Sequence, residues 1–165
     1  MISIFEMDSL TIGRVLRSDG KTRKIFQGVF ARDSIPLTLQ PLSLYVLNLD
    51  LQRNPGTHWV LINTLNCPGQ VEYFCSFGVK PKYARILDAL SNCSRKAIFN
   101  DKQVQDNWSI MCGQHVLTTA LLLSRGYSLY EILSDFYTDD LYKNDENVQF
   151  LISQQLRLSN RRRKQ

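Results

Sequence analysis

Alternating apolar and polar positions mark four strand-like runs in the first two thirds of the chain. The clearest are "SLYVLNL" at 43–49 and "THWVLINTL" at 57–65, which are rich in β-branched and aromatic residues. "QVEYFCSF" follows at 70–77, and "KAIFNDKQVQ" at 96–105 resembles a further strand. The turn-forming letters "NCPG" separate the second run from the third, so 57–77 is predicted to be an antiparallel hairpin.

Apolar residues three and four positions apart predict helices elsewhere. The first has Asp8 or Ser9 as its N-cap, and the longest ends before Gly126, which suits a helix C-cap. The segment 25–36, "IFQGVFARDSIP", contains Gly and Pro and is expected to be an irregular connection. The predicted helices are 8–18, 82–92, 112–124, 128–137 and 145–157.

Helices at both ends of the chain enclose the predicted strands, which favours an α+β fold with a mainly antiparallel sheet and flanking helices. The 165 residues, 44% of them hydrophobic, suffice for one substantial core and are too few for two ordinary domains. We therefore expect one domain at 1–156 and a basic, disordered tail at 157–165.

The positive charge of the chain is concentrated in that tail. There are 20 basic and 15 acidic residues, so the formal net charge is +5. Five basic residues and no acidic one lie beyond residue 156, which leaves the body with 15 charges of each sign. Such a tail either contacts DNA phosphates, serves as a nuclear address or is a solvated end. The basic residues are Arg157, Arg161, Arg162, Arg163 and Lys164.

No apolar run is long enough for a signal peptide or a membrane span, so we expect an intracellular protein without membrane contact. The four cysteines, Cys67, Cys75, Cys93 and Cys112, have spacings typical of neither a metal site nor a secreted disulfide framework. Reduced thiols and no bound metal are the expectation.

Cys112 stands where a nucleophilic cysteine would stand. It opens the apolar helix at 112–124, and the unpaired backbone N–H groups of a helix N-terminus favour the thiolate. Gly113 leaves room for a substrate carbonyl beside it. The alternative is a buried, inert thiol, because free cysteine is among the most buried residue types.

A nucleophilic cysteine needs a base, and the chain has only two histidines. His115 shares a helix face with Cys112 but would lie beneath it in the packing. His58, on a predicted strand, is the favoured base, with Trp59 as a packing partner that fixes it. Gln105, seven positions before Cys112, offers a side-chain amide that, with the Cys112 N–H, would form an oxyanion hole.

These residues also resemble a known family. "GTHWVLI", "YFCSFG" and "QDNWSIMCGQHVL" occur in the order found in adenain-like, adenovirus-type cysteine endopeptidases of large DNA viruses and virus-like transposons. That family is related in its core to the SUMO-specific proteases, and the resemblance covers about residues 26–124. It implies a thiol protease with His58 as base, Cys112 as nucleophile and Gln105 as oxyanion donor.

The resemblance further implies substrates and effectors. It suggests cleavage of viral precursor proteins after small residues during virion maturation, in the virion and the host nucleus or cytoplasm, by a monomer. The sequence demands no cofactor, but the family suggests stimulation by DNA and by a short activating peptide. Cys93 lies in the region where such a peptide would be linked through a disulfide.

One position departs from the family pattern. The family carries Asp or Glu before "SFG", where this chain has Cys75. The missing acid would orient the imidazole, and a thiol is a weak hydrogen-bond partner. Glu72 is expected to point to the opposite face of its strand. The site is therefore a Cys-His dyad, a slow enzyme or an inactive one.

Two other functions and a metal site stay open. A catalytically inactive protease fold would serve as a virion or nucleic-acid-binding component, and a hydrolase of ubiquitin-like conjugates would keep the chemistry but change the partner. The pair Cys112 and His115 resembles half of a zinc site, which Cys67 and Cys75 would complete.

Overall fold

The computed structural model describes residues 7–54 and 56–162. Every predicted strand and helix is present and one strand was not predicted; most boundaries differ by a few residues, but the strand predicted at 96–105 covers only 97–99. In chain order the elements are α1 (Ser9–Ser18), the 3-10 turn η1 (Thr22–Lys24), β1 (Phe26–Ala31), β2 (Leu44–Asn48), β3 (Trp59–Asn63), β4 (Val71–Cys75), α2 (Ala84–Cys93), β5 (Ala97–Phe99), α3 (Cys112–Leu123), α4 (Leu129–Ser134) and α5 (Leu141–Arg162).

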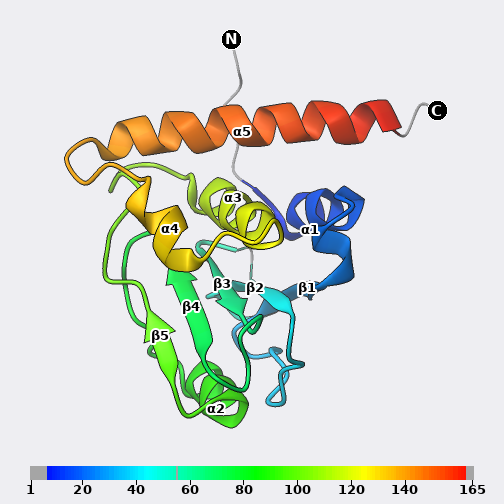
Figure 1. The fold of residues 1–165 in the computed structure, drawn as a ribbon, viewed down its shortest axis with the longest axis vertical. Coiled ribbons are helices and arrows are strands. Elements are labelled where there is room, and N and C mark those ends of the chain that lie inside the picture. The colour runs from blue at the N-terminus through cyan, green and yellow to red at the C-terminus, as the bar shows by residue number, and fades with distance from the viewer. Residues whose placement is uncertain (1–6, 55, 163–165) are drawn as a thin grey trace.

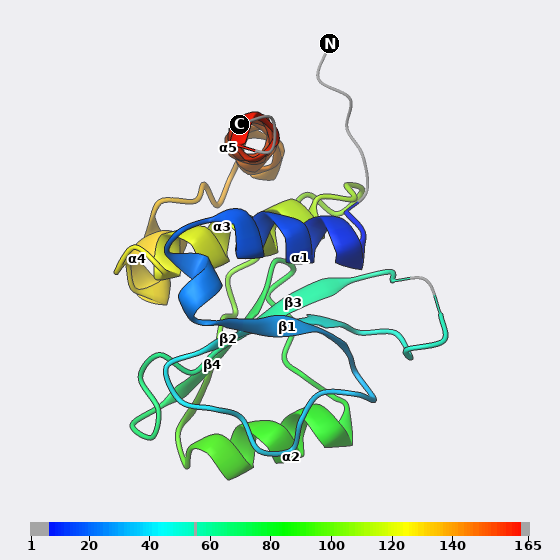
Figure 2. The same cartoon turned by 90° about the vertical axis from the view of Figure 1, so that its right-hand side faces the viewer.

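The helices cover both faces of one sheet (Figures 1 and 2). Helices α1 and α3 lie on one face, and the long α5 crosses the outer side of α3, while α2 covers the opposite face. Helix α3 is therefore enclosed between the sheet and α5, which agrees with its nearly uniform burial. The chain is a single α+β domain, as the sequence predicts.

The sheet is mixed rather than mainly antiparallel, which corrects the sequence prediction. Its five strands have the order β1-β2-β3-β4-β5. The two inner pairings, β2 with β3 and β3 with β4, are antiparallel, and the pairing of β3 with β4 confirms the hairpin predicted at 57–77. Both edge strands pair in parallel, β1 with β2 and β5 with β4. Parallel pairing at the second edge follows from the crossover through α2, which returns the chain to the same end of the sheet.

Strand β1 was mistaken for an irregular connection because a bulge interrupts its alternation. The register shifts between Phe26 and Gly28, and Gly28 has a φ of 152° that a side chain would disfavour. Phe26 and Val29, three positions apart, consequently pack into the same core cluster. A reading by alternate positions cannot detect a strand in which that spacing changes.

Two hydrophobic cores result, one on each face. The core beneath α1 and α3 contains Trp59, Leu61, Phe74 and Cys112. The core beneath α2 contains Val60, Ile62, Tyr73 and Cys75. Neighbouring residues of β3 and β4 thus alternate between the two cores, and every residue of both strands is buried.

The helix ends agree with their predicted signals, except at the C-terminus. Asp8 caps α1 by accepting a hydrogen bond of 2.6 Å from the Thr11 N–H, and Gly126 has a φ of 94° after α3. Helix α5 continues through Arg162, so the expected tail is helical as far as that residue. Leu and Arg there favour helix extension. Arg163 and Lys164 lie outside the described residues.

Among the described residues, no helix is both long and apolar enough to cross a membrane.

Candidate active site

Cys112 is the first residue of α3, as predicted. Cys112 is 6% exposed and belongs to the core beneath α1 and α3. Because α3 begins here, the backbone N–H groups of its first turn have no partners within the helix. The thiol therefore lies at the positive end of a helix dipole, which favours its ionised form.

Gly113 is held between two large side chains. A Cβ at this position would lie 2.4 Å from the Met7 Cβ and 3.4 Å from the Trp59 Cδ1. The Trp59 indole N–H donates to the Met7 carbonyl over 2.9 Å, which ties these two residues together. Trp59 thus has a packing role at ordinary contact distance, and glycine is required at position 113 because Met7 approaches so closely.

His58 lies against Cys75. The distance from the His58 Nε2 to the Cys75 Sγ is 3.2 Å, and the imidazole stacks on Phe77 with ring centroids 5.1 Å apart. His58 and Cys75 also line a shared hollow of about 240 Å³. The structure therefore places Cys75 where an orienting acid would contact the imidazole.

The protonation of this pair matters for catalysis. Burial lowers the pKa of His58 to about 4. Burial also raises the pKa of the Cys75 thiol, although the backbone N–H groups of Val79, Phe77 and Gly78 lower it. Both groups are consequently neutral at neutral pH. A neutral imidazole can accept a proton, but no negative charge beside it stabilises the imidazolium that would form.

The tautomer of His58 decides whether it can act as a base toward Cys112. If the Nε2–H donates to the Cys75 sulfur, the Nδ1 keeps a lone pair for accepting a proton. If the Cys75 thiol donates to Nε2 instead, Nδ1 carries the hydrogen and cannot be the base. A carboxylate accepts only, so it would enforce the productive tautomer, whereas a thiol does not.

His58 and Cys112 each lie next in the chain to a residue of the same packing contact. Trp59 follows His58, Gly113 follows Cys112, and Trp59 packs on Gly113. The start of β3 is thereby held against the start of α3. The side chains differ in their surroundings, because Cys112 packs beneath α3 whereas the imidazole contacts Cys75 and Phe77.

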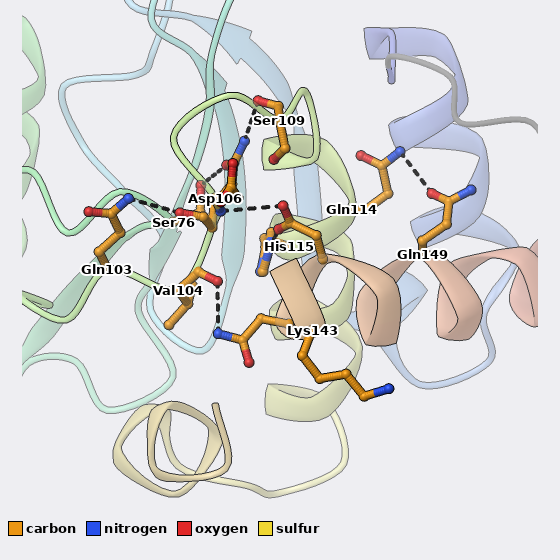
Figure 3. Close-up of polar contacts among 12 residues, drawn as sticks. Ser76, Gln103, Val104, Asp106, Ser109, Gln114, His115, Lys143 and Gln149 are labelled. Carbon is orange, nitrogen blue, oxygen red and sulfur yellow. Dashed lines mark hydrogen bonds and ion pairs between the residues drawn. The ribbon is translucent and has the colours of Figure 1, made fainter. Parts of the chain in front are cut away.

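Gln105 is fixed in the loop before α3. It is 1% exposed, its Oε1 accepts from the Ser76 hydroxyl over 2.6 Å, and its Nε2 donates to the Ser109 carbonyl over 2.9 Å. Figure 3 shows Ser76 and Ser109 with the loop that carries Gln105, beside the start of α3. Ser109 lies three residues before Cys112, so the carboxamide is anchored close in sequence to the nucleophile. Its Nε2 has a second hydrogen for a further acceptor.

His115 contacts Asp145 rather than the proposed nucleophile Cys112. Its Nε2 lies 2.7 Å from the Asp145 Oδ1, and the imidazole is completely buried between α3 and α5 (Figure 3). A second contact between these helices joins Gln114 and Gln149 over 3.4 Å. Losing either His115 or Asp145 would leave the other buried without its hydrogen bond, so this contact fastens α5 to α3.

The structure separates the residues that would have formed a zinc site. Cys75 contacts His58, Cys67 contacts Cys93, and His115 contacts Asp145. Within residues 7–54 and 56–162, no three His, Cys, Asp or Glu side chains are grouped as metal ligands.

Sequence reasoning missed two supporting residues. The Asn100 Oδ1 accepts from the Cys75 N–H over 2.8 Å, and its Nδ2 donates to the Cys75 carbonyl over 2.7 Å. Ser76 is fully buried against Gln105. Both depend on contacts between segments more than 20 residues apart, and no local spacing could have indicated them.

Two larger hollows flank the start of α3. One of about 520 Å³ is lined partly by Met7 and Trp59, which pack on Gly113. The other, of about 660 Å³, is lined partly by Met111, Trp108 and Tyr142. The Trp108 side chain is strongly exposed at 95%. Met111, the residue before Cys112, thus lines one hollow, and the two residues that pack on Gly113 line the other.

The matches of this chain to known proteins are to solved structures. No protein-family model matches the sequence, and no curated protein matches it either. Eight chains of solved structures match in fold. One, the crystal structure of the ASFV pS273R protease, has 18% sequence identity and a TM-score of 0.46, with the match covering 64% of this chain and 43% of that one. The chain thus spans less than half of that protein, and its function has to be argued from its own residues.

Substituting Gly113 tests the packing at the start of α3. We expect Gly113→Ala to destabilise the fold by about 1–3 kcal/mol, because the new methyl group would overlap Met7. Gly20→Ala is the control, since no atom lies within 4 Å of a Cβ there. Urea unfolding measures both. Equal stability of the two variants would show that Met7 does not cover Gly113.

The half-buried imidazole of His58 predicts a pH dependence of stability. The pKa of His58 is about 4 in the folded state and near 6.5 when unfolded, so the unfolded chain binds more protons between these values. The stabilisation is complete above about pH 6.5 and is lost as the pH falls toward 4. At about pH 5 the wild type should lose about 2 kcal/mol more than His58→Gln, relative to neutral pH. Parallel losses in urea unfolding would contradict a His58 that is half-buried and neutral in the folded state.

Proposed function

We propose that this chain is a cysteine endopeptidase in which Cys112 is the nucleophile and His58 the general base. The packing of Trp59 on Gly113 carries the proposal, because it holds the strand that begins after His58 against the helix that begins with Cys112. A thiol at a helix N-terminus, a neutral imidazole and an anchored amide supply the groups that acyl transfer requires.

The reaction would proceed through a thioester. His58 accepts the Cys112 proton as the sulfur attacks the scissile carbonyl, and the resulting oxyanion is stabilised by the Cys112 N–H and the Gln105 side chain. The intermediate then expels the amine, which takes the proton from His58. Water, deprotonated by His58, then attacks the thioester; the C–S bond breaks, the carboxylic acid leaves, and His58 returns the proton to the Cys112 sulfur.

Gln105 suits the role of oxyanion donor because it is already immobile. Its contacts with Ser76 and Ser109 would hold the amide in place before substrate arrives, so little reorganisation is needed during the reaction. Loss of one oxyanion donor typically lowers kcat about 100- to 1000-fold.

The proposed substrates are polypeptides cleaved after small residues such as glycine. Cys112 is only 6% exposed and Gly113 is closely covered, so a bulky side chain next to the scissile bond would be excluded. The hollows beside Trp59 and Met111 offer room for the extended chain on either side.

We further propose viral precursor proteins as the substrates and virion maturation as the setting, in the virion and the host nucleus or cytoplasm, for a monomer. This part depends on the motifs around His58, Gln105 and Cys112. DNA contact through the basic C-terminal residues belongs to the same proposal, with exposed Arg157 and Arg161 on the described part of α5.

An inactive protease fold is the second candidate, favoured by one observation. Cys75 is neutral beside His58, so the imidazolium lacks its usual counter-charge. A hydrolase of ubiquitin-like conjugates differs only in its partner and would react with ubiquitin-like electrophiles in preference to short peptides.

Covalent labelling tests the proposed enzyme against the inactive fold. A peptide ending in a glycine vinyl sulfone should label the wild type at neutral pH, because the activated Cys112 thiol attacks it. Labelling should vanish in Cys112→Ala and persist in Cys93→Ala. Mass spectrometry of the labelled peptide identifies the modified cysteine, and labelling that survives in Cys112→Ala would refute the assignment.

Restoring an acid beside His58 tests the role of Cys75. A carboxylate there should raise the pKa of His58 and fix its productive tautomer, so Cys75→Asp should raise kcat/KM on a fluorogenic glycine peptide at least about tenfold. Cys75→Asn is similar in size but uncharged and should give no such gain. Equal kinetics of the two variants would contradict the proposed dyad.

A further inference from the structure

Cys67 and Cys93 form a pair of free thiols remote from the candidate active site. Cys67 lies in the turn between β3 and β4, and Cys93 is the last residue of α2. Their sulfur atoms are 2.8 Å apart, although the residues are 26 positions apart in sequence. Neither has a part in the proposed peptidase chemistry.

The geometry is close to that of a disulfide. A disulfide bond is about 2.05 Å long, so the two sulfurs need to approach by less than about 1 Å. Both elements are held near each other by other contacts. The Ser94 hydroxyl donates to the Pro68 carbonyl over 2.9 Å, and the Val71 N–H donates to the Lys96 carbonyl over 3.0 Å. The protein backbone therefore already brings the two thiols together.

A reagent can reach this pair from one side. Cys93 lines an open hollow of about 460 Å³, together with Pro68, Gly69, Arg95 and Lys96. Burial, with the neighbouring Cys93, raises the pKa of Cys67 to about 12, so Cys67 keeps its proton until a partner withdraws it.

We propose that Cys67 and Cys93 are a dithiol that a small disulfide oxidant, such as glutathione disulfide, converts reversibly to an intramolecular disulfide. The Cys93 thiolate attacks one sulfur of the oxidant, breaks its S–S bond and releases one thiol. Cys67 then attacks the Cys93 sulfur of this mixed disulfide and releases the second thiol. The protein loses two thiol protons, which the two released thiols carry, and one oxidant disulfide is reduced.

The link would connect the beginnings of two strands that support His58. Strand β4 begins at Val71 and ends at Cys75, which contacts His58. Strand β5 pairs with β4 and leads to Asn100, which binds the Cys75 backbone through both N–H and C=O. Oxidation would therefore fix the register of the strands that position Cys75.

The pair also changes the expectation for Cys93. A peptide linked to Cys93 through a mixed disulfide would have Cys67 as an immediate neighbour, and Cys67 would displace it by the same exchange. Cys93 would then hold an external thiol only transiently. This inference does not depend on the proposed peptidase activity.

The test uses the full chain in glutathione buffers of increasing oxidised fraction, followed by alkylation and mass spectrometry. Wild-type protein should lose two of its four alkylatable thiols, with Cys67 and Cys93 joined, and dithiothreitol should restore them. Cys67→Ser should instead retain glutathione on Cys93. Cys93→Ser should take up little glutathione at Cys67, because the Cys67 thiol keeps its proton.

Thermal unfolding provides a second readout. Oxidised wild type should unfold at a temperature about 5 °C or more above the reduced form, because the link restricts the unfolded chain. Cys67→Ser should show no such rise. The proposal is overturned if wild type and Cys67→Ser retain the same glutathione adduct on Cys93, or if wild type keeps all four thiols while Cys67→Ser takes up glutathione.

Discussion

The close packing of Trp59 and Met7 on Gly113 is the contact on which the rest of the site depends. Met7 can approach so closely only because position 113 has no side chain, and the contact of Trp59 with Gly113 holds the start of α3 against the start of β3. The contact between Trp59 and Gly113 therefore holds together two elements: the helix N-terminus that favours a thiolate at Cys112, and the strand that follows His58. Helix α5, fastened to α3 through His115 and Asp145, encloses α3 from the other side.

Cys75 limits what this arrangement can achieve. It occupies the position of an orienting acid and contacts His58, but a neutral thiol neither stabilises the imidazolium nor selects its tautomer. The half-buried imidazole of His58, with a pKa of about 4, is a weak base at neutral pH. The chemistry is therefore expected to be slower than that of a complete triad. A weak enzyme and an inactive protease fold differ only in how much of the rate is lost.

The sequence predicted the parts of the structure that have local signals. Alternation located β2, β3 and β4, and apolar spacing located the helices, including the start of α3 at Cys112. It missed β1, because the bulge at Gly28 changes the spacing, and it missed the parallel edges, because strand direction depends on the path of the connections. Of the site, the contact of His58 with Cys75 follows the motif, whereas Asn100, Ser76 and the Cys67–Cys93 pair arise from tertiary packing that no spacing encodes.

The central claim is that His58 and Cys112 act as one unit, and the rate of Cys112 alkylation by iodoacetamide tests it most directly. If His58 withdraws the thiol proton, the rate at neutral pH should fall at least about tenfold in His58→Gln, and the pH at which alkylation becomes fast should move up toward that of free cysteine, near 8.5. Identical alkylation rates at every pH in the wild type and His58→Gln would contradict the account.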